Sequence, residues 1–250
     1  RVEEHLRERD VALHLETAVS GFSGDGGVER VHFDGTSEPA DVAIVGVGVE
    51  PNVDLAAGAG IELGPTGAIA TDEFGRTNLE NVYAAGDCAE ARHVVTGEPD
   101  YVPLALTANR SGRAIGQTVT GRPTPVGGTA GTAIVKAFDL GAARTGLVDE
   151  DRAREAGFEP VSVTITASTR AHYYPGGAEL DVTLLADEET GTLLGGSLVG
   201  REGAKRVDTV ATALHAGMTV AELQNADLAY APPFSPVWDP VLTAAKVLPG

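Results

Sequence analysis

The chain has 250 residues, 42% of them hydrophobic, which is enough for one large domain or two ordinary ones with packed cores. Asp and Glu number 36 against 18 Lys and Arg, and the net charge of -18 disfavours binding to nucleic acid or anionic lipid. No apolar run approaches the roughly 20 residues of a membrane span, and the single cysteine, Cys88, excludes an intrachain disulfide and a multi-cysteine metal site. We therefore expect a cytoplasmic protein without a membrane segment or a metal site.

The acidic residues are spread along the whole chain, and arginine is preferred to lysine. The lysines are Lys136, Lys205 and Lys246. Such a surface is typical of proteins from salt-loving microbes, in which carboxylates keep the surface hydrated, so the composition favours a halophilic source.

The pattern in the first part of the chain predicts a helix end, a hairpin and a buried strand. The helix end covers 1–10, the hairpin joins strands at 11–22 and 28–33 through a glycine-rich turn, and the buried strand covers 41–49. Because 41–49 is continuously apolar, it requires burial on both faces, as in a parallel sheet.

The most informative stretch is 77–87, Thr-Asn-Leu-Glu-Asn-Val-Tyr-Ala-Ala-Gly-Asp, which reads as a buried strand ending in small residues and one carboxylate. Ala84, Ala85 and Gly86 leave no bulk between backbone and ligand, so the ribityl chain of a flavin could offer its hydroxyls to Asp87. A helix beginning after this strand would favour a nearby pyrophosphate. The alternative is an ordinary strand capped by a Gly-Asp turn.

A helix is predicted over 101–120, started by Pro103, with its inner face formed by Leu104, Ala108, Ile115 and Val119. A linker rich in proline and glycine follows at 123–128, and the pattern then changes. Further strands are predicted at 132–138, 161–167, 180–186 and 192–199, and helices at 149–156 and 204–215. Strands bracketed by helices without strict alternation indicate an α+β domain. The proline-rich segment 230–240 is neither helix nor central strand.

Four stretches, in one order, resemble the pyridine nucleotide-disulfide oxidoreductases. They are Val-Gly-Val-Gly-Val-Glu-Pro-Asn at 45–52, the stretch 77–87, Pro-Leu-Ala-Leu-Thr at 103–107, and Tyr-Tyr-Pro-Gly at 173–176 together with Tyr-Ala-Pro-Pro-Phe at 230–234. The pattern is most similar to the branch of coenzyme A-disulfide reductases and NADH oxidases or peroxidases.

This resemblance implies an α/β plus α+β fold, namely the C-terminal half of a Rossmann-like FAD/NAD(P)-binding region followed by an α+β dimerisation domain. The expected bounds are the tail of an NAD(P)-binding domain at 1–40, the second half of an FAD-binding domain at 41–124 and the dimerisation domain at 125–250. The sequence contains no G-x-G-x-x-G phosphate loop, and the redox cysteine of this branch lies in the N-terminal part of its members. We therefore expect the chain to be a C-terminal fragment.

The resemblance also implies a function. An FAD-dependent enzyme would take hydride from NAD(P)H and pass it through the flavin to a cysteine-centred disulfide, a peroxide or oxygen, as a homodimer joined through residues 125–250. A ferredoxin- or rubredoxin-type NAD reductase and a non-catalytic dimerising remnant are the alternatives.

The resemblance assigns roles to individual residues. The residues expected to bind cofactor are Thr77, Tyr83, Ala85, Gly86, Asp87, Leu104, Ala105, Phe234 and, beside the nicotinamide, Gly48. Those expected to be catalytic are Tyr230, Tyr173 and Tyr174, because a phenol can donate a proton to a thiolate or peroxide. Asn109 and Trp238 are expected to face the substrate, although some coenzyme A-specific members carry a basic residue near Trp238.

Other residues have an ordinary explanation. Strand packing is the alternative for Tyr173 and Tyr174, and Cys88 is expected to be a small buried residue rather than a redox group. His215 is expected near the C-terminal end of a helix, and Lys205 and Arg206 at a solvated helix start.

Overall fold

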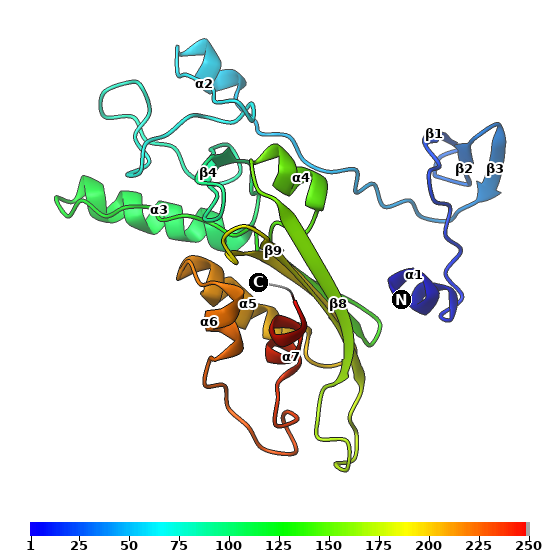
Figure 1. Ribbon diagram of the computed structural model, residues 1–250. Coiled ribbons are helices and arrows are strands. Elements are labelled where there is room, and N and C mark those ends of the chain that lie inside the picture. Colours follow the sequence, from blue (N-terminus) through cyan, green and yellow to red (C-terminus); the bar gives the residue numbers. More distant parts are fainter. Residues whose placement is uncertain (249–250) are drawn as a thin grey trace. The chain divides into compact units, whose positions relative to one another are not determined.

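The computed structural model describes residues 1–248 and divides into two units, Arg1–Glu50 and Pro51–Gly250 (Figure 1). The first unit contains α1 (Val2–Arg7) and an antiparallel three-stranded sheet of β1 (Val19–Ser23), β2 (Arg30–Phe33) and β3 (Thr36–Pro39). The predicted helix end and hairpin are confirmed. The first hairpin strand is shorter than predicted, because 11–18 is irregular.

The apolar stretch 41–49 is not a strand, so the prediction of a buried strand there was wrong. Ile44 and Val47 are 94% and 91% exposed, and no residue of the stretch joins a ladder. A parallel strand is held by hydrogen bonds to neighbouring strands on its edges. No strand in the described part of the chain pairs with 41–49, and apolar composition alone does not create one.

The second unit carries most of the regular structure. Its elements are α2 (Asp54–Gly58), β4 (Ala91–Arg92), β5 (Pro99–Asp100), α3 (Ala105–Val119), β6 (Ala133–Ala137), β7 (Leu140–Gly146), α4 (Glu150–Glu155), β8 (Pro160–Ser168), β9 (Glu179–Asp187), β10 (Leu193–Gly200), the 3-10 helix η1 (Ala204–Arg206), α5 (Val207–His215), α6 (Val220–Gln224) and α7 (Pro240–Val247). Every strand and helix predicted after residue 128 is present, whereas β7, α6 and α7 were not predicted.

The segment 51–104 is largely irregular, and the predicted strand within 77–87 was wrong. In the described residues this stretch makes one bridge, between Tyr83 and Arg76, while the parallel bridge of Ile69 with Ala89 lies just beyond it. The chain turns after Asp87 and enters β4, so the helix expected there is also absent. As at 41–49, no strand within residues 1–248 forms a full ladder with this stretch.

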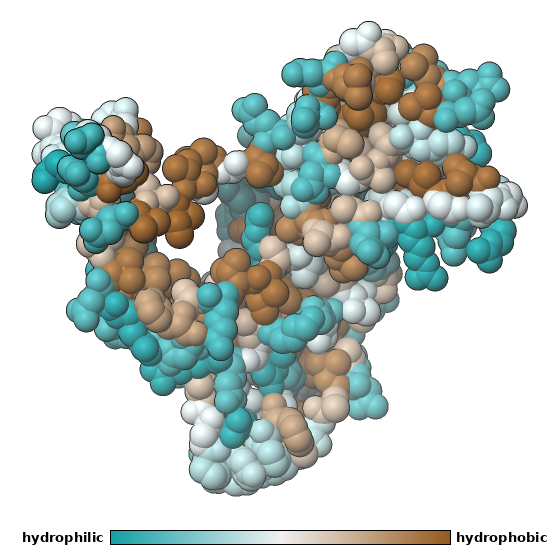
Figure 2. Space-filling model, turned by 180° about the vertical axis from the view of Figure 1, so that it is seen from behind, coloured by the Kyte–Doolittle hydropathy of each residue, from teal (hydrophilic) through white to brown (hydrophobic). Residues whose placement is uncertain are grey.

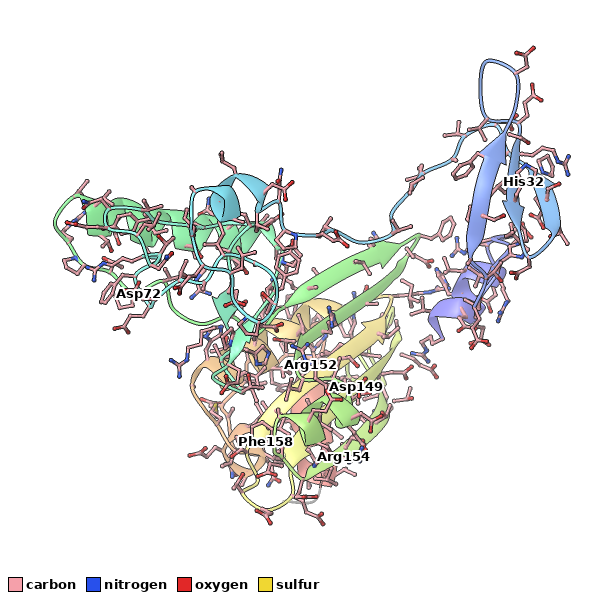
Figure 3. All side chains as sticks on the ribbon, turned by 90° about the horizontal axis from the view of Figure 1, so that it is seen from above. His32, Asp72, Asp149, Arg152, Arg154 and Phe158 are labelled. Atoms are coloured by element: carbon pink, nitrogen blue, oxygen red, sulfur yellow. The ribbon has the colours of Figure 1, made fainter. Side chains whose placement is uncertain are left out.

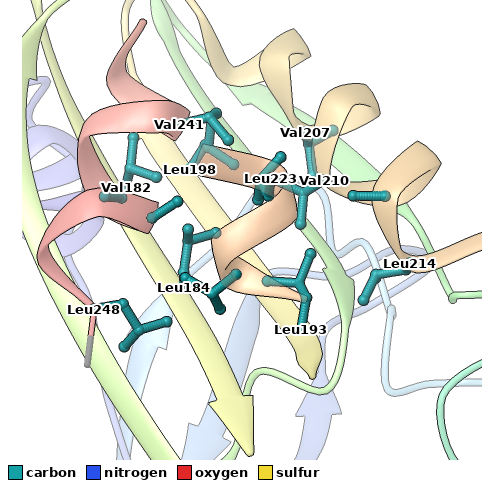
Figure 4. Packing of buried hydrophobic residues seen from close by; sticks show 14 of the residues in the cluster. Val182, Leu184, Leu193, Leu198, Val207, Val210, Leu214, Leu223, Val241 and Leu248 are labelled. Carbon is teal, nitrogen blue, oxygen red and sulfur yellow. The ribbon is translucent and has the colours of Figure 1, made fainter. Parts of the chain in front are cut away.

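A five-stranded antiparallel sheet, in the order β6-β7-β10-β9-β8, organises the rest of the unit. Side chains alternate between its two faces, because successive residues of a strand point to opposite sides. Leu184 and Leu193 join the main core with residues of α5, α6 and α7, whereas Leu185 and Leu194 join a smaller core with Ala153 of α4. Helices therefore pack on both faces, and the main core lies under α5–α7 (Figure 4).

The smaller core is closed by α4, whose start was predicted correctly. The Asp149 carboxylate accepts hydrogen bonds from the N–H groups of Asp151 and Arg152, which fixes the first turn (Figure 3). Arg152 then reaches out of the helix to Asp100 of β5 at 2.7 Å. This ion pair links the irregular segment to the sheet domain within the second unit.

Candidate functional site

The small-residue run at 84–86 lies against the first turns of α3. A Cβ added at Gly86 would come within 3.8 Å of the Cβ of Ala108, and one added at Gly75 within 2.6 Å of Ile115. Gly86 has a φ of 88°, which glycine adopts without strain. The structure therefore brings together the motif ending at Asp87 and the start of α3, two stretches that were expected to bind the same cofactor.

The start of α3 offers backbone donors. Leu104 occupies the N-cap in an extended conformation, and its side chain makes no capping hydrogen bond. The first N–H groups of a helix have no partner within the helix, and the helix dipole makes this end favourable for negative charge or for carbonyl oxygens. The N–H groups that begin at Ala105 have no side-chain cap, and the role of Ala105 in binding cofactor stays a prediction.

The Asp87 side chain is exposed, and no hydrogen bond to its carboxylate is present in the described residues. Its backbone carbonyl accepts a hydrogen bond of 3.0 Å from the Tyr101 hydroxyl. Burial raises the pKa of Tyr101, and the Asp87 charge raises it further. Tyr101 thus stays a neutral donor that fixes the backbone of Asp87, a contact that sequence reasoning missed.

Other predicted cofactor residues have structural contacts. The Thr77 hydroxyl donates to the Val82 carbonyl at 3.1 Å and accepts from the Leu79 N–H at 3.2 Å, so it closes the loop before the small-residue run. Tyr83 is half-buried in its bridge with Arg76, and Ala85 is half-buried.

The inner face of α3 differs from the prediction. The buried residues are Ser111, Ala114 and Thr118, and Val119 is 56% exposed, so its assignment to the inner face was wrong. Asn109, predicted to face the substrate, is exposed on α3.

A second group of predicted residues meets in the C-terminal part. Tyr173 and Tyr230 are 57 positions apart, yet their hydroxyl oxygens lie 3.4 Å from each other. The hydrogen bond with Tyr173 raises the pKa of Tyr230, so this phenol holds its proton more tightly. The rings are exposed, 66% for Tyr173 and 45% for Tyr230. Tyr174 is outside the pair, because its hydroxyl has no partner among the described residues.

The segment that carries Tyr230 exposes apolar side chains. Phe234 is 75% exposed, Val237 68% and Trp238 49%, and Lys246 lies 4.9 Å from the Trp238 ring centroid in a cation-π contact. Figure 2 shows that hydrophobic residues reach the surface in several places. An apolar, proline-stiffened segment of this kind is typical of a protein contact.

Arg206 holds this segment, although it was expected at a solvated helix start. Its Nε donates to Asp239 Oδ2 at 2.7 Å, and both side chains are mostly buried. Asp239 also accepts from Ser235 and caps α7 through the Val241 N–H. The sequence carried one signal for the cap, the Asp-Pro pair at 239–240. Lys205 is exposed and pairs with Asp208.

The remaining predicted residues are placed as follows. Gly48 lies in the first unit with a φ of 99°. Cys88 is half-buried, with its sulfur 3.5 Å from the Ala85 carbonyl. His215 ends α5, as predicted, and burial and the nearby Arg110 lower its pKa. Residues 1–248 contain no cluster of metal ligands and no helix long and apolar enough to cross a bilayer.

Comparison with known proteins agrees with this arrangement. The family model described as pyridine nucleotide-disulphide oxidoreductase matches residues 1–112, and the model of its dimerisation domain matches residues 132–240. An NAD(P)H sulfur oxidoreductase (CoA-dependent) of Pyrococcus furiosus is 42% identical over 247 residues, which are 99% of this chain and 55% of that protein. A coenzyme A disulfide reductase of Staphylococcus aureus is 32% identical over 93% of this chain and 52% of its own length.

Solved structures give the same result. The structure of an NAD-dependent persulfide reductase from A. fulgidus superimposes with a TM-score of 0.93 at 43% identity and covers 98% of this chain and 46% of that one. The chain thus spans about half the length of the relatives it matches. Two models of one family match consecutive parts of the chain in the order that the sequence motifs predicted. The chain belongs to the pyridine nucleotide-disulphide oxidoreductase family.

Proposed function

We propose that the chain is part of an FAD-dependent enzyme that oxidises NAD(P)H and reduces a cysteine-centred disulfide, persulfide or sulfenic acid. The observation that carries this proposal is the contact between the small-residue run and the uncapped start of α3, next to an exposed Asp87. A reducing, cytoplasmic setting belongs to the same proposal, since Cys88 is the single cysteine of the chain.

The residues at this contact fit a flavin. Gly86 and Ala85 leave the backbone open to close approach, and the free carboxylate of Asp87 can accept hydrogen bonds from ribityl hydroxyls. The N–H groups that begin at Ala105 suit the carbonyl oxygens of the pyrimidine edge. When bound, the flavin supplies the hydride and electron transfer, and the protein orients it and excludes competing reactions.

The tyrosine pair supplies the proton chemistry of the proposal. The pKa of Tyr230 is raised from an ordinary value already well above neutral, so the phenol keeps its proton and can donate a hydrogen bond to a thiolate. The Tyr173 hydroxyl is the hydrogen-bond partner of the Tyr230 hydroxyl and therefore orients it. The exposed aromatic side chains of 230–238 suit a two-fold dimer in which this segment reaches the partner's flavin site.

Two observations bear on the alternatives. A ferredoxin- or rubredoxin-type NAD reductase has no evident use for a hydrogen-bonded tyrosine pair, and the named relatives reduce sulfur compounds. Coenzyme A disulfide or persulfide as the substrate is supported by the names of such relatives. Trp238 itself is uncharged, and the charge over its ring is that of Lys246 at 4.9 Å. We therefore assign a sulfur centre as the electron acceptor. Whether coenzyme A carries this sulfur is tested by the experiment below.

The test joins this chain to the N-terminal part of the Pyrococcus furiosus relative, because the chain spans about half of that protein. We expect the chimaera to bind FAD and to oxidise NADH or NADPH in the presence of coenzyme A disulfide or persulfide. Asp87→Ala should weaken flavin binding, and Asp181→Ala, on the polar face of β9, should not. A chimaera that folds but binds no flavin contradicts the proposal.

A mixed dimer tests the role of Tyr230 across the interface. One subunit carries Tyr230→Phe and the other lacks the redox cysteine of the N-terminal part. If Tyr230 serves the partner's site, one of the two sites regains both groups and about half of the activity returns. If it serves its own subunit, both sites stay impaired, and that outcome contradicts the cross-subunit role.

A further inference from the structure

We propose that Arg206 is a positioning residue that sets the Tyr173–Tyr230 hydroxyl pair by binding the two segments that carry these tyrosines. The chemical role of the tyrosine pair rests on the proposed function, whereas the contacts that Arg206 makes are independent of it. Figure 1 shows that the β8–β9 connection and the α6–α7 connection lie at the same end of the sheet.

One guanidinium group reaches both connections. Its Nη2 donates to the Thr169 carbonyl at 3.1 Å and to the Phe234 carbonyl at 2.7 Å. Thr169 lies four residues before Tyr173, and Phe234 lies four residues after Tyr230. A change in the position of this group would therefore move both tyrosines relative to each other.

Asp239 fixes the orientation of the guanidinium. Arg206 Nε donates to Asp239 Oδ2 at 2.7 Å, and the side chains are 18% and 11% exposed. Asp239 is itself held by the Ser235 hydroxyl at 3.2 Å and by the Val241 N–H at 2.9 Å. Because the planar guanidinium is anchored at one edge, its remaining N–H groups point in fixed directions.

Little else ties the two segments together. The Ala171 N–H donates to the Pro232 carbonyl at 3.4 Å, near the limit for a hydrogen bond, and the tyrosine hydroxyls themselves lie 3.4 Å apart. The two bonds from Arg206 are shorter and charge-assisted, and such bonds are roughly twice as strong as neutral ones. The spacing of the tyrosines therefore depends mainly on Arg206.

Lysine does not replace arginine at this position. An ammonium can keep the ion pair with Asp239, but it is a compact point charge on a flexible stem and lacks the rigid fork that spans two carbonyls. Arg206→Lys should thus fold and yet release the tyrosine segments from each other. Arg206→Gln keeps most of the aliphatic stem and one amide donor group. It is a second variant in which the coupling of the two tyrosines can be measured.

The test places 3-fluorotyrosine at position 230 of the complete chain, so that its 19F signal reports the ionisation of this phenol alone. In the parent chain, Tyr173→Phe should lower the pKa of residue 230, because the hydrogen bond that raises it is removed. In Arg206→Lys and in Arg206→Gln, we expect Tyr173→Phe to cause no further change. This measurement needs no flavin. A negative result would therefore contradict the role of Arg206 without contradicting the proposed function.

Arg201→Ala is the matched control. Arg201 lies in the same connection between β10 and α5, pairs with Asp139 at 3.1 Å and is 62% exposed, but it contacts neither tyrosine segment. This variant should keep the full effect of Tyr173→Phe. A purely structural role of Arg206 would lower the stability of the chain without removing that effect. Retention of the full effect in either folded Arg206 variant overturns the proposal.

Discussion

Replacing Gly86 by alanine separates backbone strain from steric contact at the centre of the proposed flavin site. The added Cβ would have ordinary van der Waals contact with Ala108 at 3.8 Å, so no atom has to move. The φ of 88° is the source of the cost, because an L-residue in the left-handed region is strained by about 1–2 kcal/mol. We expect Gly86→Ala to destabilise the chain by about that amount.

Gly112→Ala is the control with the opposite sign. Gly112 lies inside α3, and a Cβ added there would meet no atom within 4 Å. Alanine is about 0.5–1 kcal/mol better than glycine in a helix interior, so this variant should be more stable than the parent.

Urea unfolding followed by circular dichroism measures both changes, provided that the slope of free energy against urea is unchanged. In the chimaera, Gly86→Ala should also weaken FAD binding, whereas Gly112→Ala should not. A Gly86→Ala chain that is as stable as the parent refutes the reasoning from backbone strain.

Three further predictions concern the stability of the chain. Because 36 acidic residues oppose 18 basic ones, repulsion between carboxylates should destabilise the fold at low salt. The thermal midpoint should rise with potassium chloride, since the Debye length falls from roughly 30 Å at 0.01 M to about 3 Å at 1 M. A flat midpoint would contradict a halophilic source. Leu184→Ala, at a fully buried position, should cost about 2–5 kcal/mol in urea unfolding, whereas Val135→Ala, 66% exposed on β6, should stay within about 0.5 kcal/mol; similar losses in both would contradict the assigned core. The pKa of Asp187 is lowered by hydrogen bonds from the Thr190 hydroxyl and from backbone N–H groups such as that of Glu159. The ionised Asp187 therefore stabilises the fold above the ordinary pKa of 3.8, and this stabilisation is lost as the pH falls through the lower pKa of the folded state. Asp187→Asn should therefore flatten the acid side of the stability curve measured between about pH 5 and pH 2, and an unchanged curve would contradict this role.

Local signals predicted most of the sheet domain. The turn at 187–191 and the Asp149 cap are encoded within a few residues, and the residues of β8 alternate in polarity. β7 was missed because Leu-Gly-Ala-Ala-Arg-Thr-Gly has low β-propensity and is held by its neighbours β6 and β10. The strands predicted at 41–49 and within 77–87 were wrong for the converse reason. Their residues have β-propensity, but among residues 1–248 no strand forms a ladder with them.

The candidate site could be predicted only in part. The resemblance named Tyr173 and Tyr230, but their hydrogen bond arises from the packing of two connections and has no sequence period. The role of Arg206 was missed, because an arginine at a helix start is usually solvated and its partner Asp239 follows 33 residues later. The roles in binding flavin and substrate remain predictions.

The exposed stretch at 41–49 has a consequence for handling the protein. Its segment Val-Ala-Ile-Val-Gly-Val-Gly-Val at 42–49 is rich in β-branched residues, uncharged and free of proline, which is the composition of segments that stack into amyloid-like sheets. Asp41 precedes this segment, and Glu50 and Pro51 follow it. Charges and proline at the borders of such a segment oppose stacking of further chains, so we expect these flanking residues to limit aggregation.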